Sequence, residues 1–387
     1  MPNGIDKGIN IYRAKESKIW SSRYDNKNQQ NIMAQWKKDK IQRENGEVVE
    51  AQFPVIVSAS RSTDIPAFYA DWFFDRMRKG YSAWTNPFNN KLSYVAYRDT
   101  RFIVFWSKNP KPLLNHLPYL KERNIGCYIQ YTLNDYEAEH LEQGVPSLNS
   151  RIDTFKQLVD TLGKGSVVWR FDPLILTSSI TPELLLQKIE HIGDSLQGYT
   201  EKLVFSFADI ASYRKVQSNL KKNNIDYREW TPEGMESFAG QLALLNNKWG
   251  YALATCGENI NLEHHGIEHN HCVDDTLMIR LAYKDKQLMD FLGVDIKPVE
   301  NTLFGTPTLP PNAIMLNADT YAVKKKDNRD KGQRTACGCM VSKDIGEYNT
   351  CVHLCEYCYA NAGKQTAQDN YATHLQNKTA ETITGRK

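Results

Sequence analysis

The chain has 387 residues, and 48 basic against 45 acidic residues give a formal net charge of only +3. Hydrophobic residues make up 41%, enough for a sizeable core, and 22 glycines with 15 prolines exclude collagen-like and low-complexity proteins. No apolar run has the length of a membrane-spanning helix, and the first residues lack the apolar stretch of a secretory signal. We therefore expect a cytoplasmic protein with no membrane partner.

Residues 1–50 are polar and predict an N-terminal extension, with one helix around 31–43. From Phe53 onward, short β-branched and aromatic runs alternate with segments of helical period, which indicates repeated βα units. The predicted strands are 55–60, 102–107, 127–133, 166–171, 202–207 and 251–256. The predicted helices are 66–79, 112–123, 151–162, 182–197, 211–222 and 234–248, with a hairpin over 81–97.

Six strands and six helices in alternation predict an α/β fold. The sequence contains neither GxGxxG nor GxxxxGK[ST], the loops that mark many doubly wound sheets. We therefore favour a partial (β/α)6 TIM-like barrel over residues 51–300. Beyond it we expect a linker and basic loop at 301–334, a cysteine-rich segment at 335–362 and a polar tail at 363–387 that is mobile beyond Tyr371.

Five of the eight cysteines lie within 22 residues near the C-terminal end, which favours metal or redox chemistry over a disulfide scaffold. A C-x3-C-x2-C motif is formed by Cys351, Cys355 and Cys358. Three thiolates at this spacing can hold three irons of a [4Fe–4S] cluster and leave the fourth iron open. The alternative is a zinc ion, which needs a fourth ligand such as Cys337, Cys339 or His353.

The remaining cysteines provide a second candidate site. Four thiolates can hold a second [4Fe–4S] cluster or a structural zinc ion, and the four are Cys256, Cys272, Cys337 and Cys339. Alternatively, the first two are unligated thiols of the core. Histidines 264, 265, 269 and 271 could replace a thiolate in a zinc site, although loop histidines are more often simply exposed. Cys127 remains and fits a buried strand position.

The segment CEYCYAN (355–361) resembles the cluster loop of radical S-adenosylmethionine (SAM) enzymes, in particular of their spore photoproduct lyase branch. FWSKNP (105–110), YTLN (131–134) and RFDP (170–173) are similar to strand ends of that branch. The resemblance implies that the open iron binds SAM and that an electron donor such as a flavodoxin or ferredoxin supplies the cluster.

The sequence departs from that pattern in two ways. Radical SAM enzymes usually carry the three cysteines after the first strand, whereas the loop at 60–66 has none and the motif follows the whole barrel. A C-terminal segment folded back over the carboxyl ends of the strands would restore the usual placement. In addition, Leu354 precedes the second cysteine, where the related branch often has glycine.

The chain as a whole resembles the DUF1848 family, a domain of unknown function, over residues 31–362. The resemblance implies no substrate. The matching blocks are SASRSTDIPAFYADWF (58–73), NPF (86–88), FWSKNP (105–110), WRFDPLI (169–175), FSFADI (205–210), CGENINLEHHGI (256–267) and the cysteine block at the C-terminal end.

Polar residues at the predicted strand ends complete the candidate site, because that face of a parallel barrel carries the active site. As contacts for SAM or substrate we predict Lys108, Asn109, Arg170, Asp172, Ser206, Asp209 and Glu258. The simpler alternatives are a turn at Asp172-Pro173 and an ion pair at Arg170. Arg61 and Asp64, after the first strand, are either pocket residues or a local salt bridge.

Together these features predict a radical SAM oxidoreductase, lyase or transferase that cleaves SAM reductively and acts on an unknown substrate. No catalytic residue is assigned. The alternative is a zinc-stabilised barrel that binds a ligand or nucleic acid without radical chemistry. Residues 324–334, with six basic and two acidic side chains, form either a solvated loop or a contact for phosphate or nucleic acid.

Overall fold

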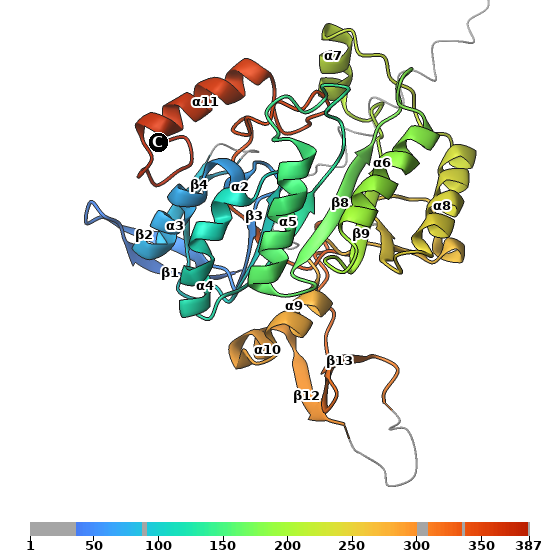
Figure 1. Cartoon of the computed structure of the whole chain (residues 1–387). Helices are drawn as coiled ribbons and strands as arrows, with labels where there is room; N and C mark the ends of the chain where they lie inside the picture. The colour runs from blue at the N-terminus through green and yellow to red at the C-terminus, as the bar shows by residue number, and fades with distance from the viewer. Residues whose placement is uncertain (1–35, 87–90, 300–308, 335–336, 386–387) are drawn as a thin grey trace, which may run out of the picture.

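The computed structural model describes residues 36–86, 91–299, 309–334 and 337–385. At its centre lies an eight-stranded sheet in which all neighbouring strands are parallel (Figure 1). In spatial order the strands are β11 (Ile267–His269), β10 (Ala252–Thr255), β9 (Lys202–Phe207), β8 (Val167–Leu174), β7 (Gly126–Thr132), β6 (Phe102–Ser107), β3 (Ile56–Ala59) and β15 (Lys343–Asp344). The predicted α/β class is therefore confirmed, and each of the six predicted strands corresponds to one strand, from β3 to β10.

Helices connect successive strands of this sheet. They are α2 (Ile65–Phe68) and α3 (Ala70–Lys79), the 3-10 helix η2 (Lys111–His116), α4 (Leu117–Glu122), α5 (Leu148–Leu162), α6 (Pro182–Ser195), α7 (Arg214–Lys222) and α8 (Pro232–Asn246). Thr181 and Thr231 cap α6 and α8 by accepting backbone hydrogen bonds of 3.3 and 3.1 Å, and each precedes a proline. Among the described residues, no helix is both long and apolar enough to cross a membrane.

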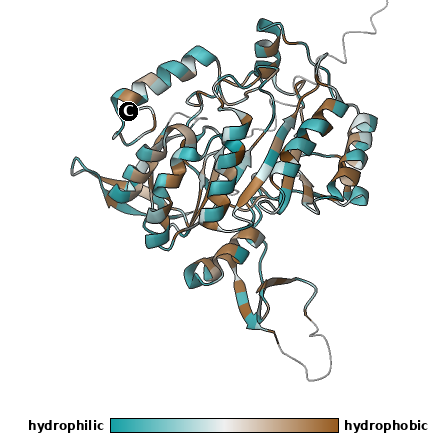
Figure 2. Ribbon diagram, in the orientation of Figure 1, coloured by the Kyte–Doolittle hydropathy of each residue, from teal (hydrophilic) through white to brown (hydrophobic). Residues whose placement is uncertain are grey.

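The core has two layers, one on each face of the sheet. In β6, Ile103 and Phe105 belong to the layer under α2–α8, whereas Phe102 and Val104 belong to the opposite layer, because side chains alternate along a strand. The opposite layer is completed by α9 (Asp275–Ala282) and α10 (Lys286–Leu292). Burial on both faces explains why a strand such as β6 (FIVFWS) is hydrophobic almost throughout. In Figure 2, β8 (VVWRFDPL) instead alternates brown with teal, because it carries Arg170 and Asp172.

A second, four-stranded sheet has the order β1 (Lys37–Gln42), β2 (Val48–Phe53), β5 (Leu92–Ala96) and β4 (Tyr81–Thr85). The hairpin predicted over 81–97 is confirmed as β4 and β5. The helix predicted around 31–43 is wrong where residues are described, because 37–42 form β1, while 31–35 lie outside the described residues. The cause is the Asn45-Gly46 turn, in which Gly46 has a φ of +86° and closes a hairpin between β1 and β2.

A three-stranded antiparallel sheet projects from the body together with α9 and α10 (Figure 1). Its strands are β12 (Val294–Pro298), β14 (Thr320–Lys324) and β13 (Ala313–Asn317), so the described part of the predicted linker contains two strands. Residues 301–308 lie outside the described residues. In the basic segment, Lys324 and Lys325 form ion pairs of 2.6 Å with Asp275 and Asp295, so its free positive charge is smaller than the sequence indicates.

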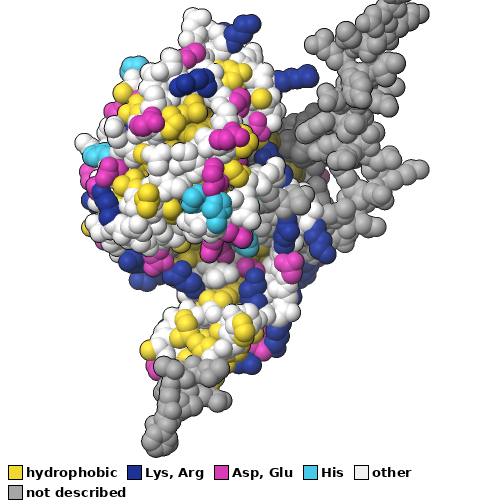
Figure 3. Space-filling view, turned by 90° about the vertical axis from the view of Figure 1, so that its right-hand side faces the viewer, with side chains coloured by type: hydrophobic (Ala, Val, Ile, Leu, Met, Phe, Trp, Pro, Cys, Tyr) yellow, Lys and Arg dark blue, Asp and Glu magenta, His cyan; other side chains and the backbone are white. Residues whose placement is uncertain are grey.

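The space-filling view in Figure 3 compares the body with this projecting part. Basic and acidic side chains are interspersed over the body, whereas hydrophobic side chains gather on the projecting part. Ile296 and Met315, from β12 and β13, are two of its exposed apolar residues. On the body in this view, side chains of both signs lie close to one another, whereas Lys and Arg side chains predominate where the body meets the projecting part.

The C-terminal tail is helical and packed, contrary to the prediction of a mobile tail. Helix α11 (Lys364–Gln376) is followed by residues 377–385, which lie against α3 and β4. Trp72 Nε1 donates a 2.8 Å hydrogen bond to the carbonyl of Ala380, and the Ala83 amide donates one of 2.8 Å to the carbonyl of Glu381. The partners are distant in the sequence and use backbone groups, so the polar composition of the tail gives no sign of them.

We predict that Glu381→Gln destabilises the fold through the docking of the tail. The Glu381 carboxylate accepts hydrogen bonds from Arg43 at 2.7 and 3.0 Å and from Tyr81 at 2.6 Å. Loss of its charge should lower the free energy of unfolding in urea by about 2 kcal/mol. Glu50→Gln is the control, because its pair with Lys38 is exposed and contributes less than about 1 kcal/mol. Equal effects of the two variants would contradict the prediction.

Candidate functional site

The C-x3-C-x2-C loop, Cys351–Cys358, lies against the loops that follow strands β3, β6 and β7, at their carboxyl ends. His353 joins it to two of these loops. Its Nε2 lies 2.7 Å from Asp64 Oδ2, after β3, and its backbone carbonyl accepts a 2.8 Å hydrogen bond from the Gly144 amide, after β7. The two backbones touch so closely at Gly144 that a Cβ there would lie 2.4 Å from the Val352 carbonyl oxygen.

The chain just before this loop is anchored to the edge of the sheet. Strand β15 pairs in parallel with β3. The Asp344 carboxylate accepts hydrogen bonds from Ser58 Oγ at 3.0 Å, Ser60 Oγ at 2.8 Å and the Arg61 amide at 2.9 Å. Asp344 therefore fixes the point from which the C-terminal segment crosses the strand ends.

A buried polar network ties the loop to β6 and β7. Glu142 Oε1 accepts hydrogen bonds from Lys108 Nζ at 2.7 Å, from Asn134 Nδ2 at 3.1 Å and from the hydroxyl of Tyr357. Burial alone would raise the pKa of Glu142, but the charges of Lys108 and Arg151 and the hydrogen bonds lower that pKa to about 2. Lys108 therefore holds the cysteine loop in place, and its ammonium group is occupied by Glu142.

The three thiols of the loop are at least half-buried. Burial raises the pKa of Cys351, Cys355 and Cys358 above the usual thiol range. Metal ligation requires thiolates, and a bound cation would supply the positive charge that these buried sulfurs otherwise lack. Nearby, Thr63 Oγ1 and Asn361 Oδ1 are buried without a hydrogen-bond partner among the described residues, so polar groups remain available to a bound group.

The four other cysteines of the two predicted sets form one cluster. Cys256 follows β10 and Cys272 precedes α9, and their sulfurs lie 3.2 Å apart. Hydrogen bonds continue from Cys272 to Cys339 and from Cys339 to Cys337. The fold thus brings together the end of β10, the start of α9 and the segment before β15. Cys127 lies apart in β7, the predicted strand, where it is partly buried, and burial raises its pKa to about 12.

Within this cluster, the sulfur of Cys272 accepts hydrogen bonds from two polar side chains. Its sulfur accepts hydrogen bonds of 3.1 Å from both Arg170 Nη1 and Asn270 Nδ2. Hydrogen bonds from Cys256 and Cys339, together with the charge of Arg170, lower the pKa of Cys272 well below its usual range. The site therefore stabilises a thiolate at this position.

The predicted contacts for SAM or substrate fall into two groups. Asp172 accepts hydrogen bonds from Arg170 and Ser206, so these three side chains meet at the ends of β8 and β9. Glu258 Oε1 accepts a 2.9 Å hydrogen bond from the Phe207 amide, and burial raises its pKa to about 7.

The other three predicted contacts for SAM or substrate form hydrogen bonds with groups of the surrounding loops. Lys108 is bound to Glu142, and Asp209 Oδ1 accepts a 3.2 Å hydrogen bond from the Ser212 amide. Asn109 follows Lys108, and its backbone amide donates a 2.9 Å hydrogen bond to Ser107 Oγ. These three residues shape the loops after β6 and β9.

The sequence analysis assigned no role to Gln130, Asn134 and Glu142. In the structure these residues form hydrogen bonds with predicted site residues such as Arg170, Asp172 and Lys108. Gln130 accepts a 3.2 Å hydrogen bond from Arg170 and donates one of 2.8 Å to the Cys272 carbonyl. The only available signal was the position of Gln130 and Asn134 within or just after a predicted strand. Glu142 lies in a long loop, where an acidic residue is ordinarily solvated.

Arg61 and Trp106 complete the wall beside the four-cysteine cluster. The guanidinium groups of Arg61 and Arg170 each lie 5.5 Å from the Trp106 ring centroid. Burial alone would lower the pKa of Arg61, but the neighbouring Cys339 and Asp344 raise it. Arg61 Nη2 is buried and has no hydrogen-bond partner within the described ranges. Arg61 is therefore a residue of the site rather than a partner in a salt bridge with Asp64.

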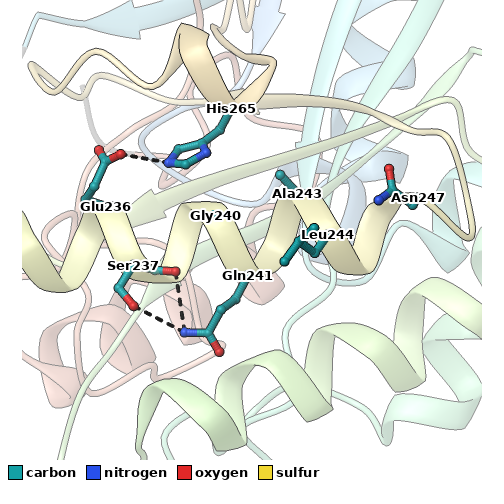
Figure 4. A pocket seen from close by; sticks show the side chains of 8 residues that line it. All are labelled: Glu236, Ser237, Gly240, Gln241, Ala243, Leu244, Asn247 and His265. Carbon is teal, nitrogen blue, oxygen red and sulfur yellow. Dashed lines mark hydrogen bonds and ion pairs between the residues drawn. The ribbon is translucent and has the colours of Figure 1, made fainter.

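Neither cysteine set is gathered into the compact group of ligands of a closed zinc site, although the sulfurs of Cys256 and Cys272 lie only 3.2 Å apart. In neither set do three sulfurs of the described residues all lie within 4.8 Å of one another. Tetrahedral zinc, with Zn–S bonds of about 2.3 Å, holds its sulfurs about 3.8 Å apart. Histidines 264 and 265, considered as possible fourth ligands, instead contact Glu236 beside a surface pocket on α8 (Figure 4).

Comparison with known proteins gives one result. A family model described as "Domain of unknown function (DUF1848)" matches residues 56–360, which includes the parallel sheet and both cysteine sets. No curated protein and no solved structure matches the chain.

We predict that Gly144→Ala displaces the cysteine loop. The new Cβ would lie 2.4 Å from the Val352 carbonyl oxygen and 2.9 Å from His353 Cα, and backbone cannot yield as a flexible side chain can. We expect a loss of about 2 kcal/mol in unfolding free energy and faster alkylation of the loop thiols. Gly363→Ala is the control, because no heavy atom lies within 4 Å of its added Cβ. Unchanged alkylation in Gly144→Ala would refute the prediction.

We predict that Glu142→Gln destabilises the protein in a pH-dependent way. The folded-state pKa of Glu142 is about 2, below the ordinary carboxyl value, so its stabilising effect is present above about pH 4.5 and is lost as the pH falls toward 2. The variant should be less stable by about 3 kcal/mol near neutral pH, and the difference should shrink on acidification. Urea unfolding over a pH series measures this.

The control for this series is Glu190→Gln, which alters an exposed pair with Lys248. Its effect should stay below about 1 kcal/mol at every pH. A difference between wild type and Glu142→Gln that is constant with pH would show that the carboxylate charge does not stabilise the fold.

Proposed function

The chain belongs to the DUF1848 family, whose description names no activity, and we propose that it is a radical SAM-type iron–sulfur enzyme. In this proposal a partial (β/α)6 barrel carries a [4Fe–4S] cluster at Cys351, Cys355 and Cys358. The cluster leaves one iron open for SAM. A second cluster occupies the set formed by Cys256, Cys272, Cys337 and Cys339. The substrate is a separate question.

The observation that carries the proposal is the position of the three-cysteine loop. Its thiols, of which Cys355 is buried and the other two are partly buried, lie over the carboxyl ends of parallel strands that lie side by side in chain order, the face on which such barrels carry their active sites. The loop after the first strand, β3, has no cysteine. The C-terminal segment lies beside this loop, because Asp344 accepts a hydrogen bond from Ser60 and His353 contacts Asp64. This supports a relocated cluster loop rather than a lost one.

The backbone before the second cysteine gives further support. Leu354 has a φ of +55°, in the left-handed region that glycine adopts most readily. Glycine is frequent at this position in the branch that the motif resembles. The loop therefore keeps the conformation of a glycine although the residue has changed.

The residues of both sets fit iron–sulfur clusters. In the three-cysteine loop the sulfurs do not all lie within 4.8 Å of one another, so they can reach separate irons, and three ligands leave one iron open. Cys256 and Cys272, whose sulfurs lie 3.2 Å apart, would separate to ligate different irons. Arg170 and Asn270 donate hydrogen bonds to Cys272, the kind of contact that adjusts the potential of a cluster. When bound, a reduced cluster supplies the electron that cleaves SAM to a 5′-deoxyadenosyl radical.

The chain's own residues orient and enclose this chemistry. Glu142, Lys108 and Tyr357 hold the loop rigidly and exclude water behind it. Asp172 and Ser206, at the ends of β8 and β9, are placed to bind polar groups of SAM or substrate. Glu258 can hold a proton on Oε2 near neutral pH, since its pKa is raised to about 7 and Oε1 is bound to the Phe207 amide. An electron donor such as a flavodoxin or ferredoxin is the partner that this function requires.

The proposal predicts the iron content of the protein and of cysteine variants. After anaerobic reconstitution, the wild type should contain about eight irons and eight sulfides per chain. Replacing Cys351, Cys355 and Cys358 by alanine should leave about four irons and abolish both SAM cleavage and the SAM-dependent change in the EPR spectrum. Replacing Cys256, Cys272, Cys337 and Cys339 should also leave about four irons but retain the SAM-dependent change.

Cys127→Ala is the matched control, because this thiol lies outside both sets. It should keep the full iron content and the response to SAM. Zinc in place of iron in the wild type would overturn the proposal and favour a zinc-stabilised binding protein. SAM cleavage that survives loss of the three-cysteine set would overturn the assignment of that set.

A further inference from the structure

Two histidines and a glutamate form a cluster outside both cysteine sets, between α8 and the 3-10 turn η3 (Glu263–His265). Glu236 comes from α8, and His264 and His265 come from η3. Their Nε2 atoms lie 2.5 and 2.7 Å from the same oxygen, Glu236 Oε1. One ligand atom from each residue lies within 4.8 Å of the other two, and within the described residues this is the single group of three His, Cys, Asp or Glu residues that meets this spacing.

The cluster is open to solvent, and a glycine of α8 leaves room for one of its histidine rings. The side chains of His264, Glu236 and His265 are 57%, 42% and 25% exposed, so an ion can reach them without unfolding. Figure 4 shows His265 turned toward Glu236 at one end of a pocket on α8. A Cβ at Gly240 would lie 3.2 Å from His265 Cε1, so the absence of a side chain there leaves room for the ring.

We propose that Glu236, His264 and His265 bind a divalent transition-metal ion of the zinc class. Two imidazole nitrogens and one carboxylate oxygen are ligands that Zn²⁺ accepts, and three protein ligands leave the fourth position to water. Imidazole ligands favour zinc, copper and nickel over magnesium and calcium. The proposal is independent of the chemistry at the cysteines.

The ion has a structural consequence for the neighbouring site. Turn η3 lies in the segment that joins Cys256 to Cys272, and Glu236 belongs to α8, an element on the outside of the sheet. A metal held between them ties this segment to α8. The same ion also means that zinc in the purified protein is not by itself a sign of zinc at the cysteines.

Titration of the full chain with Co²⁺ and Zn²⁺ tests the proposal. The protein is first stripped with a chelator, and the wild type is compared with the double variant His264→Gln, His265→Gln. The double variant should bind one Co²⁺ fewer, and the lost ion should lack the intense near-ultraviolet bands of cobalt bound to thiolate. Zn²⁺ should raise the Tm of the wild type and leave a smaller rise in the double variant, in which any remaining shift comes from the cysteines.

His191→Gln, an exposed histidine on α6, is the matched control and should bind as the wild type does. Glu236→Gln keeps hydrogen-bonding capacity but removes the anionic ligand, so its affinity for Zn²⁺ should fall at least about tenfold. The double variant and Glu236→Gln are compared with wild type by circular dichroism without metal to confirm folding. Equal stoichiometry and affinity in wild type and double variant, or thiolate bands on the lost ion, would overturn the proposal.

Discussion

The buried carboxylate of Glu142 is the interaction on which the cysteine-bearing end of this molecule depends. One oxygen accepts hydrogen bonds from Lys108, Asn134 and Tyr357, which come from the ends of two strands and from the cysteine loop itself. A carboxylate and an ammonium group buried together gain stability only when both are well paired, and losing either is costly. The network therefore holds the loop in one position, as a pre-organised site requires.

The two cysteine sets share one side of the molecule but have different surroundings. The three thiols of the loop are raised in pKa by burial, with Lys108 as a nearby cation. The four-cysteine cluster is lined by Arg61 and Arg170, separated by the ring of Trp106, and it stabilises a thiolate at Cys272. The two sets therefore differ in that only the four-cysteine cluster contains a thiol, Cys272, whose pKa is lowered well below its usual range.

The strands and the grouping of cysteines could be predicted because each follows from a local signal. Strands buried on both faces are hydrophobic throughout, and clustered cysteines stand out against chance. The prediction of a helix around residues 31–43 was wrong because the Asn45-Gly46 turn closes a hairpin in this polar stretch. The packing of the tail and the role of Glu142 could not be predicted, since both depend on partners far apart in the sequence, such as Trp72 with Ala380.

Strand β15 is only two residues long, yet it is the last strand to join the sheet and it leads directly into the cysteine loop. During synthesis, β3 to β11 leave the ribosome before β15, and domains generally fold as units while the chain grows. The edge of the sheet at β3 therefore stays unpaired until β15, which begins more than 250 residues after Ala59 at the end of β3, has been made. The three cysteines of the loop are therefore the last to be made, and a chain cut short before residue 343 would keep the other seven strands of the sheet but lack three of its eight cysteines.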